Sequence, residues 1–193
     1  MNGSLALVGS GEYLPAMVVL EKSLIDDAVA NGKTPTYIQI PTAAGRESAE
    51  KLDYWKELGE AQAERIGVQS IHLPIYTRED AFKQENIDAI DNSALMYLSG
   101  GDPHHLAATL IDTPVWSAIV SNWQSGASLA GCSAGAMVLS SHIPNFRVLK
   151  SSPTVGLNLL PEIRVIPHFN VLKGLPNQQL LNGEQIHLNR PND

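Results

Sequence analysis

The sequence has a single cysteine, Cys132, among its 193 residues. One thiol excludes an internal disulfide framework and is typical of a protein from a reducing compartment. Every apolar run is far shorter than the roughly 20 residues that a membrane-spanning helix needs. The amino terminus carries no basic segment and reaches Glu12 too early for a secretory signal. These absences predict a cytoplasmic protein that makes no contact with a membrane.

Basic runs are absent as well. The chain holds 13 Lys and Arg against 20 Asp and Glu, a formal net charge of −7. Proteins that bind nucleic acid usually concentrate positive charge along one face, and no segment here does so. No cysteine–histidine spacing matches a metal site either. We therefore expect no nucleic-acid partner, no metal and no cofactor.

What the chain does have is the composition of a folded domain. Hydrophobic residues make up 44% and charged residues 17% of the sequence, as in ordinary globular proteins. A chain of this length buries most of its apolar surface without covalent cross-links. We predict that residues 1–193 form a single domain.

Apolar, strand-like runs alternate with longer helix-like segments. The predicted strands cover residues 4–9, 36–41, 68–74, 94–102 and 127–131, and the predicted helices cover 15–31, 47–66, 78–90 and 114–124. Strands that are apolar throughout and separated by helices indicate a parallel sheet covered on both faces. The predicted fold class is thus a three-layer α/β fold of the flavodoxin-like kind, with a mostly parallel, doubly wound sheet.

The loops that follow the strands should meet at one edge of this sheet. Crossovers between parallel strands are nearly always right-handed, and ligands bind at the carboxyl edge of such sheets. After Ser141 the pattern weakens to one more predicted strand, residues 162–167, which ends at His168, and a hairpin around Asn182 and Gly183. The loops expected at the carboxyl edge are residues 9–12, 41–46, 100–105 and 131–135.

One of these loops contains the pattern Gly-x-Ser-x-Gly, with Ser133 at its centre. A strand before the serine and a helix after it are the context that a nucleophile elbow needs. The serine then sits at strained backbone angles, and side chains at the two glycine positions would collide with neighbouring elements. The N–H of Ala134, at the start of the helix, would point at the same place as the hydroxyl. The alternative is that small residues merely allow strand and helix to pack closely.

A second glycine pair, in the segment Leu98–Leu106, follows another predicted strand. Backbone N–H groups in such a turn can point outward and bind an anion. Acyl transfer needs a second oxyanion donor besides the one after the nucleophile, and Gly101 is well placed to supply it. Asp102 followed by Pro103 is also a good helix start by itself, and both interpretations can hold at once.

A serine nucleophile needs a base within reach, and the chain has six histidines. His168 ends the last predicted strand and so should arrive at the same sheet edge as Ser133. The alternative is a structural histidine. His104 and His105 are adjacent, so their side chains point apart, and His72 fits a structural role better.

Four segments carry a resemblance to a known family: LVGSGEY, LSGGDPHHL, GCSAGAMV and GLNLLPEIRVIPHF, in this order, within residues 4–170. Together they resemble the serine peptidases that include dipeptidase E (aspartyl dipeptidase) and cyanophycinase, which have a class I glutamine amidotransferase-like α/β fold. The resemblance implies that Ser133 is the nucleophile and His168 the base. It also implies an oxyanion hole built from the N–H groups of Ala134 and the Gly101 region.

The same resemblance implies a small peptide or amide as substrate. The family suggests peptides with an acidic residue or a β-aspartyl linkage, for which Arg46 would supply a positive contact. Glu12 would face the substrate side of the pocket, and Asp102 completes the expected substrate-binding set. The oligomeric state stays open, with a homodimer as one candidate.

Three features depart from the family pattern. No Asp or Glu lies between Ser133 and Glu162, so the acid that would orient His168 is not identified. The segment after His168 lacks the arginine-rich continuation of cyanophycinase. The chain ends at Asp193, earlier than the pattern leads us to expect, which predicts that a last strand or helix is missing. A Ser–His pair still works without the acid, although its imidazolium is less well stabilised.

These departures keep other functions open. The main alternative is a non-catalytic binding or structural protein on the same scaffold, and an esterase with the same elbow is a third. Glutamine amidotransferases of this fold use a cysteine at the elbow, but Cys132 stands one residue too early. We expect Cys132 to be a small buried residue.

Overall fold

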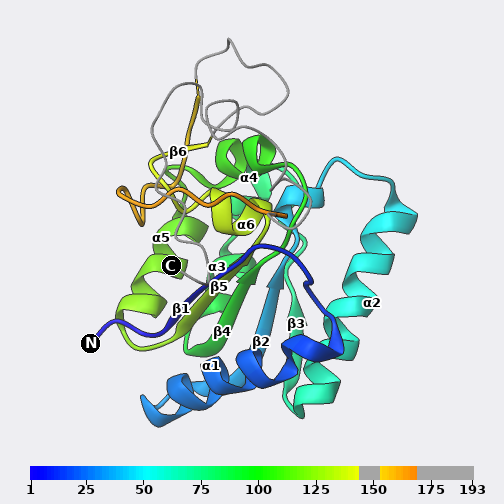
Figure 1. Ribbon diagram of the computed structural model, residues 1–193, viewed down its shortest axis with the longest axis vertical. Helices are drawn as coiled ribbons and strands as arrows, with labels where there is room; N and C mark the ends of the chain where they lie inside the picture. The colour runs from blue at the N-terminus through cyan, green and yellow to red at the C-terminus, as the bar shows by residue number, and fades with distance from the viewer. Residues whose placement is uncertain (144–152, 169–193) are drawn as a thin grey trace, which may run out of the picture.

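The computed structural model describes residues 1–143 and 153–168 (Figure 1). The predicted hairpin around Asn182 and Gly183 lies outside these residues. The main sheet has five parallel strands in the order β1-β5-β4-β2-β3. Its strands are β1 (Leu5–Val8), β2 (Thr34–Ile40), β3 (Gln69–His72), β4 (Ser93–Leu98) and β5 (Ser128–Cys132).

The helices lie in two layers, one on each face of the sheet (Figure 1). Alternate side chains of each central strand point to opposite layers, as the pleat requires. In β2, for example, Tyr37 packs toward one layer and Ile38 toward the other. The first layer contains α1 (Val18–Ala30) and α2 (Ala49–Ile66), and the second contains α3 (Gln84–Ile90), α4 (Pro103–Leu110), α5 (Pro114–Gln124) and α6 (Ala134–Met137). This is the predicted three-layer α/β architecture.

The short elements mark the loops between these helices and strands. Two single turns, η1 (Pro15–Met17) and η2 (Thr42–Ala44), follow β1 and β2. A small antiparallel pair, β6 (His142–Ile143) and β7 (Thr154–Val155), stands apart from the main sheet. Within the described residues, no helix is both long and apolar enough to cross a membrane.

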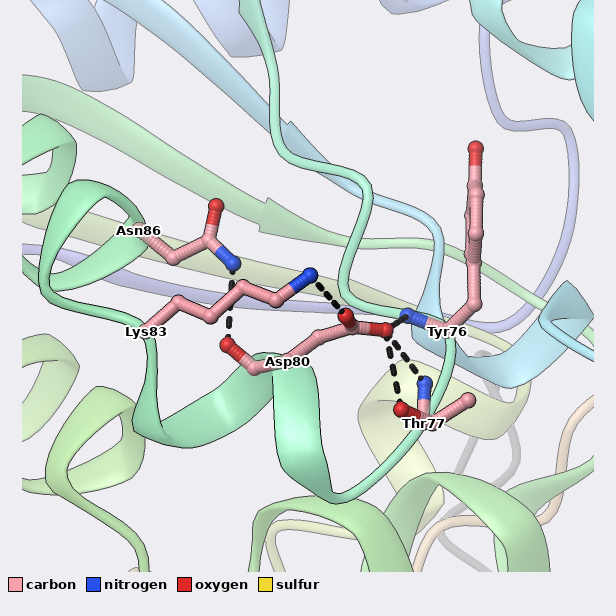
Figure 2. A network of polar contacts seen from close by, with 5 residues as sticks. All are labelled: Tyr76, Thr77, Asp80, Lys83 and Asn86. Carbon is pink, nitrogen blue, oxygen red and sulfur yellow. Dashed lines mark hydrogen bonds and ion pairs between the residues drawn. The ribbon is translucent and has the colours of Figure 1, made fainter.

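The helix predicted over residues 78–90 is wrong as a single element. It is divided into η3 (Glu79–Phe82) and α3, because Lys83 is extended, with φ −71° and ψ 128°. The Asn86 side chain donates to the carbonyl of Asp80 (2.9 Å), and the Asp80 carboxylate accepts from Tyr76 N–H and Thr77 N–H (Figure 2). These side chains satisfy backbone groups locally and so replace a continuous helix.

The strand predicted over residues 162–167 is also wrong. Residues 161–162 form a turn, and residues 163–166 run to His168 without pairing with a strand. Proline lacks the N–H that a ladder needs, and Pro161 and Pro167 flank this run. A hydrogen bond from His168 N–H to Gly9 O (3.2 Å) holds the end of the segment instead.

The strand order explains where the site lies. Because β1, β5, β4 and β2 are consecutive neighbours, the four loops that follow them lie side by side at the carboxyl edge. Two backbone hydrogen bonds join these loops: Ser133 N–H to Val8 O, and Asp102 N–H to Ala43 O, each 2.8 Å. The predicted convergence of these loops is confirmed.

Candidate active site

Ser133 occupies the tight turn between β5 and α6, in a strained backbone conformation with φ 49° and ψ −108°. The flanking glycines are a steric necessity. A Cβ on Gly131 would lie 2.4 Å from the Gly135 carbonyl oxygen, and one on Gly135 would lie 2.0 Å from the Leu98 carbonyl oxygen. A strained residue costs about 1–3 kcal/mol and persists only where its surroundings impose it. The turn thus has the tight, strained backbone that a nucleophile elbow requires, and we refer to it below as the elbow.

His168 lies beside this elbow, with its Nε2 3.0 Å from Ser133 Oγ. It also has a left-handed backbone conformation, with φ 53°. The carbonyl of Val8 accepts from Ser133 N–H, and the carbonyl of the next residue, Gly9, accepts from His168 N–H. The end of β1 therefore positions both members of the pair, a role that sequence reasoning missed.

The far nitrogen of the His168 ring, Nδ1, has no hydrogen-bond partner within residues 1–143 and 153–168. Glu162, the first carboxylate after Ser133, is exposed and makes no bond to His168. The same described residues contain no group of three or more His, Cys, Asp or Glu placed to hold a metal ion. The pair is a Ser–His dyad as far as the described residues go.

Two backbone N–H groups near the dyad are free to donate. Ala134, the first residue of α6, and Gly101, after β4, have N–H groups without an acceptor among the described residues. Gly101 has φ 139°, and a Cβ there would lie 2.5 Å from the Ala43 carbonyl oxygen. The N–H of Gly100, by contrast, donates to Glu12 Oε2 at 2.7 Å. Of the glycine pair, Gly101 is the one left available.

Glu12 and Cys132 lie together next to the elbow. Burial raises the pKa of Glu12, and the Gly100 N–H partly offsets this by stabilising the carboxylate. Burial, together with the nearby Glu12 carboxylate, raises the pKa of the Cys132 thiol to about 12. A thiol is nucleophilic only as a thiolate, so this environment disfavours reaction at Cys132. It is a small buried residue, as predicted.

A cavity of about 410 Å³ opens beside the dyad. Ser133, His168, Glu12, Gly100 and Gly101 line it. Sequence reasoning missed its apolar lining, which is Leu14, Tyr54, Trp55 and Leu58. The available signal was an exposed aromatic residue, Tyr54, on a helix whose other exposed positions are mostly charged.

Arg46 and Asp102, both expected to bind substrate, are not among the described residues that line this cavity. Arg46 Nη1 lies 3.9 Å from Asp102 Oδ2, and both side chains are largely exposed. Asp102 caps α4 by accepting from His104 N–H and His105 N–H, at 2.9 and 3.2 Å. The two side chains of the adjacent histidines point apart, toward Thr154 and the Tyr76 carbonyl.

Comparison with solved structures places the chain among peptidases. A peptidase from an acI-B1 actinobacterium is 57% identical, with a TM-score of 0.88, over 93% of this chain and 74% of that one. A provisionally named peptidase E protein from Listeria monocytogenes EGD-e shares the fold, at 24% identity and a TM-score of 0.63, over 88% of this chain and 81% of that one.

Sequence comparison agrees. Cyanophycinases from Trichormus variabilis and Nostoc sp. are each 33% identical over 153 residues, which cover 72% of this chain and 48% of the relative. The chain thus spans about half the length of the curated relatives it matches. The model of peptidase family S51 matches residues 5–187. The chain therefore belongs to peptidase family S51, the serine peptidase family of dipeptidase E and cyanophycinase.

Proposed function

We propose that this protein is a serine hydrolase that cleaves a small peptide or amide. Ser133 Oγ attacks the substrate carbonyl carbon while His168 Nε2 takes the hydroxyl proton. The tetrahedral intermediate collapses as the C–N bond breaks, and Nε2 returns the proton to the leaving amine. Water, activated by the same nitrogen, then releases the acid and restores the Ser133 hydroxyl.

In this proposal the N–H groups of Ala134 and Gly101 stabilise the oxyanion. Both are backbone donors without another acceptor in the described residues, so they need no rearrangement before they bind negative charge. Removing one such donor typically costs about 3 kcal/mol in transition-state stabilisation. Glu12 holds the neighbouring Gly100 N–H and so keeps the glycine turn in place.

The observation that carries the proposal is the 3.0 Å contact between Ser133 Oγ and His168 Nε2 at a strained elbow. A nucleophile and base within about 2.6–3.2 Å are the geometric signature of covalent catalysis by serine. Both residues need unfavourable left-handed backbones to meet. Structural hydrogen bonds seldom require such strain on both sides.

The test is labelling with diisopropyl fluorophosphate, followed by intact-protein mass spectrometry. We expect one phosphoryl group per chain in the wild type and none in Ser133→Ala. In His168→Ala the labelling rate should fall by about 100-fold or more, because the base is lost. Ser23→Ala, at an exposed site on α1, is the matched control and should label like the wild type. An unlabelled wild type would contradict the proposal.

A second candidate is a ligand-binding protein that retains the pocket without turnover. The observation that favours it is the bare Nδ1 of His168 within the described residues, since an orienting acid normally holds that nitrogen. This candidate predicts peptide binding with the same affinity in wild type and Ser133→Ala, and no product by mass spectrometry. Release of free amine by the wild type alone would eliminate it.

A further inference from the structure

Four apolar side chains line the cavity that contains the dyad, and we refer to them as the apolar wall: Leu14, Tyr54, Trp55 and Leu58. Leu14 precedes η1, and the other three lie on α2, within little more than one helical turn. Leu14 and Tyr54 are 55% and 53% exposed, so much of their apolar surface is open to a ligand in the cavity.

Buried hydrogen bonds from the sheet hold the apolar wall in place. Gln39, a fully buried residue of β2, donates from Nε2 to the Trp55 carbonyl (2.7 Å) and to the Tyr13 hydroxyl (2.9 Å). Its Oε1 contacts His72 Nδ1 at 2.9 Å. A Cβ on Gly59 would lie 2.5 Å from the Gln39 side chain, so α2 approaches the sheet closely here. The wall is thus a preformed surface rather than a loose one.

Contacts between tilted aromatic rings also hold the apolar wall in place. The ring of Trp55 lies 6.4 Å from that of Tyr13 and 5.7 Å from that of Tyr54, in tilted arrangements. The indole N–H donates to Glu47 Oε2 at 3.3 Å. Aromatic pairs of this geometry add about 0.5–1.5 kcal/mol beyond area burial.

The charge of the described lining residues does not suit an acidic substrate side chain. Among the described lining residues, none is Lys or Arg, and the one carboxyl group is that of Glu12. Arg46, the expected positive contact, lies beside Asp102 instead. A substrate carboxylate placed here would lose water and meet a second acidic group, with no cation among the described lining residues to compensate.

We propose that the apolar wall is the side-chain subsite of the substrate, and that it selects an uncharged aliphatic or aromatic residue over Asp or Glu next to the bond attacked by Ser133. This inference rests on the proposed hydrolase function. It departs from the acidic preference that the family resemblance suggested. The chemical class of substrate is therefore a short peptide with an apolar residue at the cleaved bond.

Diphenyl phosphonate esters of leucine, phenylalanine and aspartate test this choice, because they react with an active serine and differ only in the side chain. The measured quantity is the second-order rate constant of Ser133 modification. We expect the leucine and phenylalanine probes to react at least about tenfold faster than the aspartate probe, as a matched apolar pocket allows. A faster aspartate probe, or equal rates, would overturn the proposal.

Tyr54→Ala and Phe82→Ala form a matched pair, since Tyr54 and Phe82 are 53% and 52% exposed and only Tyr54 lines the cavity. Tyr54→Ala should lower the rate with the phenylalanine probe about tenfold and leave the aspartate rate unchanged. Phe82→Ala should change neither rate. Leu14→Arg places a cation at an exposed wall position and should shift the preference toward aspartate. Equal effects of Tyr54→Ala and Phe82→Ala, or an unchanged probe preference in Leu14→Arg, would contradict the proposal that the apolar wall is the side-chain subsite.

A binding measurement in Ser133→Ala separates this proposal from the hydrolase itself. If no phosphonate labels the wild type, the hydrolase proposal fails. Calorimetry with two amidated dipeptides, one containing leucine and one containing aspartate, then tests the subsite by itself. Tighter binding of the leucine peptide, lost in Tyr54→Ala, supports the wall. Absence of binding, or binding that favours the aspartate peptide, overturns it.

Discussion

The Asp80 turn and the Ser133 elbow are both polar clusters at sharp changes of chain direction, and they are built in opposite ways. The Asp80 carboxylate accepts from Tyr76 N–H (3.1 Å), Thr77 N–H (2.8 Å) and the Thr77 hydroxyl (3.1 Å), and it pairs with Lys83 Nζ at 2.7 Å (Figure 2). Ser133 Oγ, by contrast, has His168 as its one hydrogen-bond partner among the described residues.

The difference separates polar groups that stabilise the fold from those kept for a substrate. At the Asp80 turn the donors and acceptors satisfy one another, so little is left for a ligand. At the elbow the backbone is strained, and the N–H groups of Ala134 and Gly101 have no acceptor in the described residues. Unpaired donors and strain lower stability, and they are typical of functional sites.

The largest expected effect is on activity alone. Ser133→Ala should lower peptide hydrolysis by a factor of about 10⁴ to 10⁶, because the nucleophile is lost. Its free energy of unfolding should change by less than about 1 kcal/mol, since within residues 1–143 and 153–168 the hydroxyl has one partner, the exposed His168. Hydrolysis assays and urea unfolding measure the two quantities. An equally large loss of stability would show that Ser133 has a structural role like that of Asp80.

The next effect is on stability at the elbow. Gly135→Ala should lower the free energy of unfolding by about 3 kcal/mol, because the new Cβ would lie 2.0 Å from the Leu98 carbonyl oxygen. Gly32→Ala is the control, since Gly32 has φ 87° but open space around it, and it should cost only about 1 kcal/mol. Similar losses in the two variants would contradict a collision at the elbow.

The next effect is the pH dependence of stability that we expect from Glu21, a buried acid with few partners. Burial raises the pKa of Glu21 to about 7, and its main partner is Gln62 Nε2 at 2.8 Å. The folded protein therefore holds a proton that the unfolded chain releases near pH 4.5, so stability should fall as pH rises from about 5 to 8. Glu21→Gln should flatten this slope and gain about 1–2 kcal/mol at pH 8.

Thermal unfolding of wild type and Glu21→Gln from pH 5 to pH 8 measures this slope. Glu64→Gln, at an exposed position of α2, serves as the control and should follow the wild type. A slope that persists in Glu21→Gln would assign the pH dependence to another group.

The smallest expected effect is at the Asp80 turn, where the stability should change with pH in the opposite direction to that expected for Glu21. Burial acts to raise the pKa of Asp80, but the hydrogen bonds that Lys83 and Thr77 donate to its carboxylate outweigh burial and lower the pKa to about 2. The stabilisation is thus present above the unfolded pKa, near 4, and is lost as pH falls toward 2. Asp80→Asn should cost about 1 kcal/mol at pH 7, since the group is partly solvated, and leave hydrolysis unchanged.

Urea unfolding at pH 7 and pH 3 checks this, with Asp91→Asn as an exposed control. The difference between wild type and Asp80→Asn should shrink at the lower pH. A reduced rate of hydrolysis in Asp80→Asn would mean that the two clusters are coupled after all.

Features set by neighbours along the chain could be read from the sequence. The start of α5 follows from Pro114, and Thr113 caps the helix by accepting from Trp116 N–H at 3.3 Å. The elbow was readable because its glycines, strand and helix lie within a few residues of Ser133. Local patterns also failed for one of the predicted helices. The helix predicted over residues 78–90 is divided, because the side chains of Asn86 and Asp80 bond to nearby backbone groups in place of a continuous helix.

The sequence by itself therefore determined the alternating α/β pattern, the elbow at Ser133 and the glycine turn at Gly101. Periodicity, glycine and proline placement and capping act over a few residues, so one chain is enough to reveal them.

Only the tertiary structure decided the strand order and what it brings together. The carbonyls of Val8 and Gly9 hold Ser133 and His168, and α2 supplies the apolar wall, across separations of 40 to 160 residues. Such contacts depend on how layers pack and on which strands pair, and no local pattern encodes them.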